Sequence, residues 1–511
     1  MKKFLIPVFL LSLLVLCGCA TNPVTGEEEL QLLPESMELD MGVERYVPMR
    51  QQSGGDYRLY PGLSGYVERV GNKLASVSDR YLPYEFVIVN DSTPNAWALP
   101  GGKIAINRGL LVELKNEAEL AAVLGHEIVH AAARHGAKGI ERGLLLQGTM
   151  LGLGVMVGDN ENRDLILGVA GIGGQLITQR YSREQELEAD HYGMIYMKRA
   201  GYDPQAAVGL QQTFVRLSRG NGQNWLEGLF ASHPPSQERV EKNRQLATSL
   251  GNGGRLGEKE YQKAIAGLQH DRPAYDTYDR GRELLERSPK RALKLAQKAI
   301  AIQPDEALFW SLKGDALMAL KRNREAYKAY DQALARDNSY FRHYLGRGLV
   351  GVRLGKATAE ADLENSMDLL PTAVASYSLG RLAIKRGDID AAVEYLQQAA
   401  ATDSPIGKKA MKQLLQVDLP RRPGKYIETE LYRGEGGQLM VSVYNGTDFT
   451  IKDVMLEVFR RGDKKGRIRK RVPGILRPDE EKLIHTPFRG LKKNKQVKRY
   501  KVRVVRARVS R

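Results

Sequence analysis

Apolar and polar positions follow two different periods in the first half of the chain. Between residues 116 and 137 the apolar residues fall three or four positions apart, which predicts an amphipathic helix. Residues 182–200 predict a second helix, because Gly201 follows them and a proline stands three positions further on. Residues 84–90 and 103–107 are short apolar runs bounded by turn-forming residues, as is typical of β-strands. This part of the chain is therefore predicted to combine helices with a few short strands.

A second region, residues 273–419, has a helical and repetitive pattern. Glycines recur there at steps of 33, 34 and 32 residues, and small residues at such offsets let paired antiparallel helices approach closely. The pattern resembles tetratricopeptide repeats, about four of them. A helical bundle without repeats is the alternative. The recurring glycines are Gly281, Gly314, Gly348 and Gly380.

The last region, residues 420–511, changes to period-two alternation of apolar and polar residues. Gly, Asn and Asp residues separate the alternating runs, which predicts a small antiparallel β-sandwich. The predicted fold class of the whole chain is therefore α+β. It comprises a mainly helical domain with a few strands, an α-solenoid of repeats, and the sandwich.

Composition narrows the class of protein. The chain has 511 residues, of which 42% are hydrophobic and 27% charged, so it is not disordered throughout. Length alone predicts about three domains. The two cysteines, Cys17 and Cys19, exclude a disulfide framework and a zinc site built on cysteine.

The net charge of +17 is concentrated at the C-terminus. Residues 421–511 hold 26 Lys and Arg against 10 Asp and Glu, a surplus of 16, so the rest of the chain is almost neutral. Nucleic acid is not expected as a partner, because the N-terminus, described next, has the pattern of an export signal. The candidates are anionic lipid head groups, lipopolysaccharide phosphates or an acidic protein. The alternative is a solvated surface without a specific ligand.

The N-terminus has the pattern of a lipoprotein signal peptide. Two lysines, an apolar run and small residues occupy residues 1–18, and the run is shorter than the ~20 residues of a membrane-spanning helix. The stretch from Leu16 to Cys19 resembles a bacterial lipobox, which makes Cys19 the lipidated first residue. An ordinary secretory signal is the alternative. Since no acidic residue directly follows Cys19, the pattern resembles lipoproteins of the outer membrane, anchored on its periplasmic face.

One motif carries the strongest chemical signal. His126, Glu127 and His130 form an HExxH pattern inside the predicted helix 116–137. Residues four apart share one helical face, so both imidazoles can bind one ion, and Glu127 can reach a water on that ion. With 8 histidines in the chain, such a motif arises by chance in roughly one chain in a hundred.

The third ligand has to come from another segment. Catalytic zinc takes three protein ligands and keeps one position open for water. The predicted helix 182–200 offers Glu184, Glu186 and Glu188, and the pattern alone leaves all three eligible. Asp190 suits a different role, in which it accepts a hydrogen bond from a ligand histidine and fixes its tautomer.

Taken together, the motifs resemble the gluzincin metallopeptidases of the CAAX-prenyl-protease and HtpX group. In layout they resemble the BepA-like periplasmic proteases, which also carry tetratricopeptide repeats. The segments NAWALPGGKIAINRGLL, HEIVH, ExEAD and SHPPSQERV occur in that order. The resemblance covers about residues 57–251 and, loosely, the repeats. It does not reach the basic C-terminal region.

The resemblance implies one Zn²⁺ per chain. His126, His130 and Glu186 match the zinc ligands of the family, and Glu127 matches its general base. The same resemblance implies a site in which peptide bonds are hydrolysed.

Roles for four further residues are implied by the resemblance. His233 matches a histidine that gates the zinc or stabilises the oxyanion, and Arg239 matches an arginine of the same loop. Asn95 and Ala96 match the segment on which the substrate backbone lies. His135, beyond the motif, is predicted to be a surface residue.

Two functions follow from this reading. The first is a zinc metalloendopeptidase that hydrolyses misfolded or misassembled envelope proteins, with the repeats docking substrate or outer-membrane assembly machinery. The alternative is a chaperone or scaffold for outer-membrane assembly with a latent zinc site. The intact motif favours the first, since a scaffold does not need Glu127.

The predicted parts are a signal peptide at 1–18, a tether at 19–56, the metallopeptidase domain at 57–251, a linker at 252–272, the repeats at 273–419 and the basic sandwich-like domain at 420–511.

Overall fold

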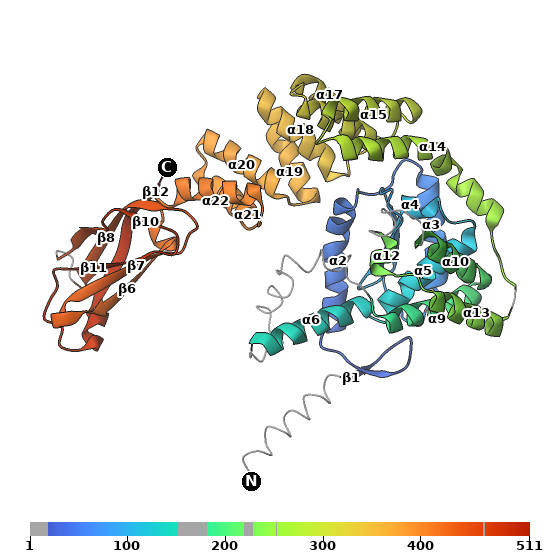
Figure 1. Cartoon of the computed structure of the whole chain (residues 1–511), viewed down its shortest axis with the longest axis horizontal. Helices are drawn as coiled ribbons and strands as arrows, with labels where there is room; N and C mark the ends of the chain where they lie inside the picture. The colour runs from blue at the N-terminus through green and yellow to red at the C-terminus, as the bar shows by residue number, and fades with distance from the viewer. Residues whose placement is uncertain (1–18, 152–180, 219–227, 252, 463–465, 511) are drawn as a thin grey trace, which may run out of the picture. The chain divides into compact units, whose positions relative to one another are not determined.

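The computed structural model describes residues 19–151, 181–218, 228–251, 253–462 and 466–510 (Figure 1). The predicted signal peptide, residues 1–18, lies outside the described residues. The chain divides into two compact units, Met1–Val350 and Gly351–Arg511. None of the described helices is long and apolar enough to cross a membrane.

The segment predicted as a tether, residues 19–56, is folded. Helix α2 packs against a small sheet, where Tyr46 donates a hydrogen bond from its hydroxyl to the carbonyl oxygen of Ile104 at 2.7 Å, and Met49 is buried in the same cluster. The prediction missed this because the helix is rich in charged residues and its apolar partners lie some fifty residues further along the chain. The elements of this segment are β1 (Cys19–Thr21), β2 (Glu28–Leu30) and α2 (Glu35–Gln52).

The small sheet has the order β3-β5-β4. Strand β3 (Glu85–Val89) runs parallel to β5 (Lys103–Asn107), and β4 (Ala96–Leu99) runs antiparallel to β5. The two strands predicted at residues 84–90 and 103–107 are thus confirmed. Strand β4 lies at the end of this order and, among the described strands, pairs only with β5.

Two helices of the first unit touch at their backbones. A Cβ atom built on Gly193 of α9 would lie 3.0 Å from the backbone nitrogen of His126, and one built on Gly125 of α5 would lie 3.1 Å from the carbonyl oxygen of Gly193. Glycine therefore permits a helix crossing that a side chain would widen. Asn116 caps α5 and Ser182 caps α9, each accepting a hydrogen bond from a backbone N–H in the first turn. The helices around this crossing are α3 (Pro61–Ala75), α4 (Arg108–Leu111), α5 (Glu117–Ala132), α6 (His135–Leu151), α9 (Arg183–Arg199), α10 (Gln205–Ser218), α12 (Leu229–Ser232) and α13 (Gln237–Leu250).

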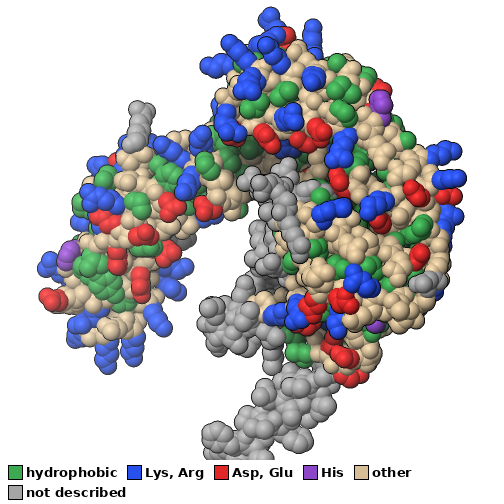
Figure 2. All heavy atoms as spheres, turned by 45° about the vertical axis from the view of Figure 1, so that its right-hand side comes forward, with side chains coloured by type: hydrophobic (Ala, Val, Ile, Leu, Met, Phe, Trp, Pro, Cys, Tyr) green, Lys and Arg blue, Asp and Glu red, His purple; other side chains and the backbone are tan. Residues whose placement is uncertain are grey.

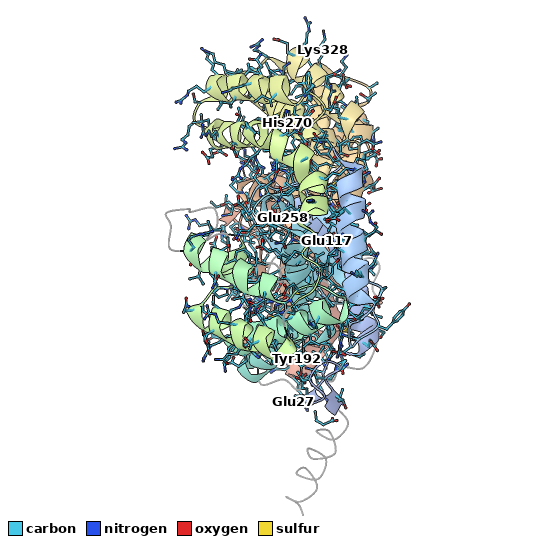
Figure 3. The ribbon with its side chains drawn as sticks, turned by 90° about the vertical axis from the view of Figure 1, so that its right-hand side faces the viewer. Glu27, Glu117, Tyr192, Glu258, His270 and Lys328 are labelled. Carbon is cyan, nitrogen blue, oxygen red and sulfur yellow. The ribbon has the colours of Figure 1, made fainter. Side chains whose placement is uncertain are left out.

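The predicted linker, residues 252–272, mostly belongs to a long helix, α14 (Glu258–Leu284). Figure 3 labels Glu117 and Glu258, the first residues of α5 and α14, which lie close together. The backbone N–H of Ala118 donates to the carbonyl oxygen of Leu256 at 3.0 Å, which joins the two helix starts. The predicted linker is therefore largely helical, and the helix that crosses residue 273 begins at Glu258.

The repeats consist of paired helices with glycines at their crossings, as the sequence predicts. A Cβ atom on Gly314 would lie 2.8 Å from the ring of Tyr330, and one on Gly380 would lie 2.8 Å from Leu396. These helices are α15 (Pro289–Ile302), α16 (Ala307–Ala319), α17 (Asn323–Arg336), α18 (Phe341–Leu354), α19 (Ala359–Leu369), α20 (Ala373–Arg386), α21 (Ile389–Ala400) and α22 (Pro405–Asp418).

A buried carboxylate joins the first repeats to the strand-containing part of the same unit. Glu306 accepts hydrogen bonds from the side-chain amide of Asn90 at 3.2 Å and from the hydroxyl of Tyr275 at 2.5 Å. Asn90 in turn accepts from Nε of Arg108 at 2.7 Å. Burial raises the pKa of Glu306 above its ordinary value.

The C-terminal residues form two packed antiparallel sheets, which confirms the predicted sandwich. One sheet has the order β10-β8-β12 with β9 also paired to β8, and the other has the order β11-β7-β6. Inward-facing residues of both sheets share one core, to which Leu415 of α22 and Leu419, the residue after α22, also belong. The strands are β6 (Ile427–Arg433), β7 (Leu439–Asn445), β8 (Ile451–Arg460), β9 (Ile468–Arg471), β10 (Ile475–Leu476), β11 (Glu481–His485) and β12 (Tyr500–Val509).

Candidate metal centre

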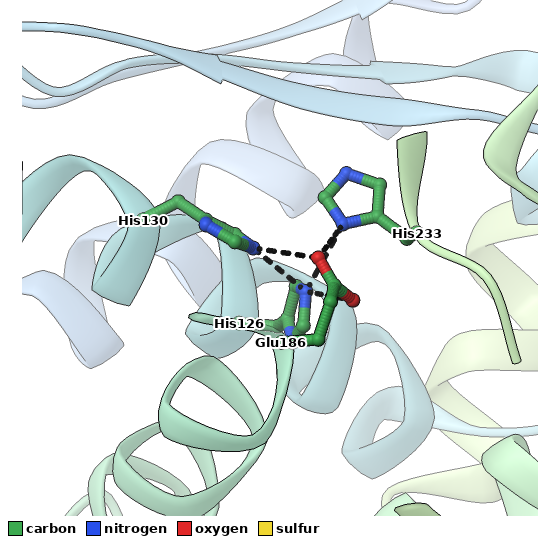
Figure 4. Close-up of side chains that lie close together, drawn as sticks. All are labelled: His126, His130, Glu186 and His233. Atoms are coloured by element: carbon green, nitrogen blue, oxygen red, sulfur yellow. Dashed lines mark hydrogen bonds and ion pairs between the residues drawn. The ribbon is translucent and has the colours of Figure 1, made fainter. Parts of the chain in front are cut away.

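The close crossing of α5 and α9 brings together four buried groups that can bind a metal. His126 and His130 project from α5, Glu186 projects from α9, and His233 follows α12 (Figure 4). One nitrogen or oxygen atom of each lies within 4.8 Å of those of the others. The structure thus brings the predicted ligand set into one cluster.

The distances within the cluster suit a small cation. Nε2 of His130 lies 3.0 Å from Nε2 of His126 and 3.4 Å from Oε1 of Glu186. Nδ1 of His233 lies 2.9 Å from the same carboxylate oxygen. Burial holds the pKa of His130 well below its ordinary value, so its imidazole is neutral, as a metal ligand requires. Imidazole nitrogen and carboxylate oxygen are ligands that zinc accepts.

Asp190 and Arg239 support the cluster from behind. Oδ1 of Asp190 lies 3.0 Å from Nδ1 of His126, so a neutral His126 that binds a metal through Nε2 donates its other N–H to Asp190. Nε and Nη2 of Arg239 each donate to an oxygen of Asp190 at 2.7 Å. Burial would raise the pKa of Asp190, but the charge of Arg239 and these hydrogen bonds hold it below its ordinary value. Asp190 thus contacts a ligand histidine directly, and Arg239 contacts Asp190.

Glu127 lies beside the cluster without belonging to it. Its side chain is 1% exposed, and its Oε1 lies 3.7 Å from Nε2 of His233. Within the described residues, its Oε2 is buried and has no hydrogen-bond partner. A buried carboxylate oxygen costs free energy unless something hydrogen-bonds to it. The position of Glu127 Oε2 therefore suits a hydrogen bond from a water held next to the metal.

His135 is buried, so the prediction that it lies on the surface is wrong. Its Nδ1 lies 2.8 Å from Nδ1 of His130, and its Nε2 lies 3.3 Å from Oε1 of Glu188. A chain of hydrogen bonds thus leads from Glu188 through His135 to the second ligand histidine. The ring of Tyr181 stacks on that of His130, with ring centroids 3.8 Å apart.

A sharp turn brings His135 back onto His130. Helix α5 ends at Ala132, and Arg134 adopts a left-handed conformation with φ of 60° before α6 begins. Arg134 holds this conformation through Glu38, at 2.8 Å, and the carbonyl oxygen of Leu33, at 2.9 Å. An arginine at this φ is uncommon, and both of its partners are about a hundred positions away in sequence. No local pattern therefore marked the turn.

Asn95 and Ala96 lie next to the loop that carries His233 and are not part of the cluster. Ala96 is the first residue of β4 and pairs with Ile106, and Asn95 precedes it. The carbonyl oxygen of Pro94 accepts a hydrogen bond from the N–H of Leu229, the first residue of α12, at 3.0 Å. This bond ties the approach to β4 to the segment that ends at His233.

A small cavity of about 40 Å³ opens beside the cluster. His126, Glu127 and His233 contribute polar groups to its lining. Its other walls are mainly apolar, so it suits a small apolar side chain. The apolar wall includes Val123, Met194, Met197, Leu210, Phe214 and Leu229.

A two-histidine helix, a carboxylate from a second helix and a buried glutamate beside them define the metallopeptidase class of site. Comparison with known proteins agrees with this class. Residues 61–247 match the model of peptidase family M48, and residues 312–374 and 373–404 match tetratricopeptide-repeat models. The chain thus contains an M48 zinc metallopeptidase domain followed by tetratricopeptide repeats, which confirms the resemblance seen in the sequence.

Curated proteins named as metallopeptidases or proteases match about a third of the chain. A mitochondrial metalloendopeptidase OMA1 of Schizosaccharomyces pombe is 34% identical over 187 residues, which cover 35% of this chain and 51% of the relative. A putative beta-barrel assembly-enhancing protease of Vibrio cholerae is 31% identical, covering 37% of this chain and 40% of the relative. The metalloprotease YcaL of Escherichia coli is 28% identical, covering 35% and 75%. The chain spans about half or less of the length of the first two.

Proposed function

We propose that this chain is a zinc-dependent endopeptidase of the bacterial envelope that hydrolyses misfolded or misassembled outer-membrane proteins. The observation that carries the proposal is the buried cluster of His126, His130 and Glu186, with a Glu127 carboxylate oxygen beside it that has no hydrogen-bond partner in the described part of the chain. Relatives named beta-barrel assembly-enhancing proteases support the choice of substrate class.

His126, His130 and Glu186 would hold the zinc. When bound, zinc would polarise the scissile carbonyl and make the attacking water more acidic. Glu127 would accept a proton from the attacking water and pass it to the leaving amine. Asp190 keeps the Nδ1 proton of His126 in place, so that Nε2 stays available to the metal.

His233 has one of two roles in this scheme, gating the metal or stabilising the oxyanion. Its Nδ1 lies 3.3 Å from Nε2 of His126 and 2.9 Å from Glu186. The position of this Nδ1 atom among the metal-binding groups supports the gating role. In that role His233 would occupy the metal site until the substrate displaces it. Movement of the loop after α12 would then accompany substrate binding.

The substrate would bind as an extended strand. Strand β4 ends its sheet, and a peptide can add to such an edge through main-chain hydrogen bonds. Asn95 and Ala96 begin this edge, and the apolar cavity would take one substrate side chain. Both features select unfolded polypeptides, because a folded protein does not offer an extended backbone.

We also place the protein on the periplasmic face of the outer membrane, attached through lipid on Cys19. The repeats would dock substrate or the outer-membrane assembly machinery. The basic C-terminal domain would contact anionic lipid or lipopolysaccharide, and no nucleic acid is involved. These assignments rest on the lipobox-like sequence, the charge distribution and the names of the relatives.

A chaperone or scaffold role with a latent zinc site is the second candidate. The observation that favours it is the position of His233 among the metal-binding groups, where it would block the open site.

Glu127→Gln tests the peptidase assignment. We expect this variant to keep about one zinc per chain and to lose about 10²- to 10⁴-fold in the rate of casein hydrolysis, because it cannot accept a proton. Glu184→Gln is the matched control, since Glu184 is exposed on α9. Proteolysis at the wild-type rate in Glu127→Gln would refute the assignment. If Glu127→Gln rescues an envelope-assembly defect as well as the wild type does, the scaffold function is the correct one.

A further inference from the structure

The outer face of the β8–β9–β12 sheet is strongly basic. Arg469 and Arg503 flank Glu457 in one cross-strand row, and Arg471 and Arg506 flank Met455 in the next. Side chains paired across neighbouring strands point to the same face, so these cations lie on one surface. We call this surface the basic sheet face. It is formed by Arg469, Arg471, Lys501, Arg503, Arg506 and Arg508, all of which are exposed.

A buried carboxylate orders part of this face. Glu457 is 5% exposed, and it pairs with Arg503 at 2.5 Å and with Arg469 at 3.6 Å. Both arginines remain largely exposed, at 55% and 73%. The guanidinium groups are therefore held over the sheet while most of their surface stays open to a ligand. The same face also presents Ile475, which is 41% exposed and pairs with Lys452 of β8.

The outer face of the other sheet has the opposite charge. Its rows include Glu428–Tyr444–Glu481 and Glu430–Ser442–Leu483. All three glutamates are exposed. A surface selected only for solubility mixes both signs, whereas this domain segregates them on its two faces. An anionic surface would therefore attract one face and repel the other.

We propose that the basic sheet face binds the phosphate-bearing surface of an anionic lipid bilayer. The cations are spread over a sheet face rather than gathered at a point, so a planar surface can meet them together. Each Lys or Arg close to such a surface contributes a favourable electrostatic term, and the terms decay within a Debye length. The exposed Ile475 beside them can enter the interfacial region. An acidic polypeptide is the competing partner, and the experiment distinguishes the two.

The test measures binding to vesicles. The chain from Ala20 to Arg511, which lacks the acylation site, is mixed with vesicles of 30% phosphatidylglycerol in phosphatidylcholine or of phosphatidylcholine alone, and sedimented. We expect binding to the anionic vesicles only, and weaker binding as NaCl rises from 50 to 500 mM. The variant R469Q/R471Q/R506Q/R508Q should bind the anionic vesicles roughly 100-fold more weakly than the wild type. It leaves Arg503 and Arg467 paired with the buried Glu457.

The matched control removes the same charge from the repeats. Lys and Arg side chains also project from the repeats (Figure 2), and K290Q/R291Q/K294Q/K298Q neutralises four exposed ones on α15. It should bind like the wild type, and so should the quadruple Arg→Lys variant of the basic sheet face. If the quadruple Gln variant fails to fold by circular dichroism, the doubles R469Q/R471Q and R506Q/R508Q should each lose roughly 10-fold.

Three results would overturn the proposal. Equal loss in the α15 control would show that net charge alone drives binding. Equal binding to both kinds of vesicle would show that anionic lipid is not recognised. Displacement of the chain from vesicles by polyglutamate at an equal concentration of negative charge would identify an acidic polypeptide as the partner.

Discussion

Arg239→Met removes a buried guanidinium that two buried carboxylates share. Arg239 contacts both oxygens of Asp190 at 2.7 Å, and its Nη1 lies 2.7 Å from Oε2 of Glu186. Methionine replaces the side-chain stem but leaves both carboxylates without this cation. Removing one partner of a buried ion pair costs about 3–5 kcal/mol. We therefore expect the region where α9 and α13 meet to lose about that much stability in the metal-free protein.

Amide hydrogen exchange in the presence of a chelator measures this local loss. A cost of 3–5 kcal/mol corresponds to roughly 10²- to 10⁴-fold faster exchange of the α9 and α13 amides that open with this region. The double variant Asp190→Asn/Arg239→Met should lose less than the two single variants added together, because it leaves one fewer unpaired carboxylate. The difference between the sum and the double variant gives the coupling of the pair.

The same two helices provide a matched control. Arg183 of α9 and Glu238 of α13 form an ion pair on the exposed surface, where ion pairs contribute little. Arg183→Met should leave the exchange rates almost unchanged. Wild-type exchange in Arg239→Met, or strict additivity with Asp190→Asn, would refute the view that this arginine stabilises the site electrostatically.

Three further predictions concern buried groups elsewhere in the first unit. Burial raises the folded-state pKa of Glu306, so its contribution to stability is greatest below the unfolded-state pKa and falls as the pH rises through the folded-state value. Thermal unfolding between pH 4.5 and 8 should therefore show the stability of Glu306→Gln increasing relative to that of the wild type as the pH rises. The opposite trend would contradict this. His135→Ala should weaken zinc binding about 10- to 100-fold in chelator competition, whereas His191→Ala, at an exposed position, should not. Equal zinc affinity in both variants would exclude a supporting role for His135. Gly193→Ala should force α5 and α9 apart by a few tenths of an ångström and weaken zinc binding, while Gly143→Ala in an open position of α6 should leave zinc affinity unchanged.

The part of the site that follows local periodicity could be predicted from the sequence. The spacing of His126 and His130 requires only a helix, and the structure provides one with both residues on the same face. The choice of Glu186 over Glu184 and Glu188 did not follow from spacing and came from the resemblance alone. The structure gives the physical reason, because the crossing of α5 and α9 turns the side chain of Glu186 toward the histidines.

The features that sequence analysis missed all depend on distant contacts. The left-handed turn at Arg134 needs Glu38 and Leu33, which lie far upstream, so the burial of His135 had no local signal. The folding of residues 19–56 depends in the same way on the sheet that follows them. A helix rich in charged residues is predicted to be solvent-exposed until the surface that covers its apolar residues is known.

Helix α9 determines the geometry of every group that would hold the metal. It provides Glu186 directly, it orients His126 through Asp190, and it reaches His130 through Glu188 and His135. Asp190 fixes the tautomer of His126 directly, whereas Glu188 acts on His130 only through His135, and both carboxylates lie on the same helix. A shift of α9 relative to α5 would therefore disturb all three ligands together. The backbone contact at Gly125 and Gly193 limits such a shift, so the integrity of the metal site depends on a helix crossing as much as on the ligands themselves.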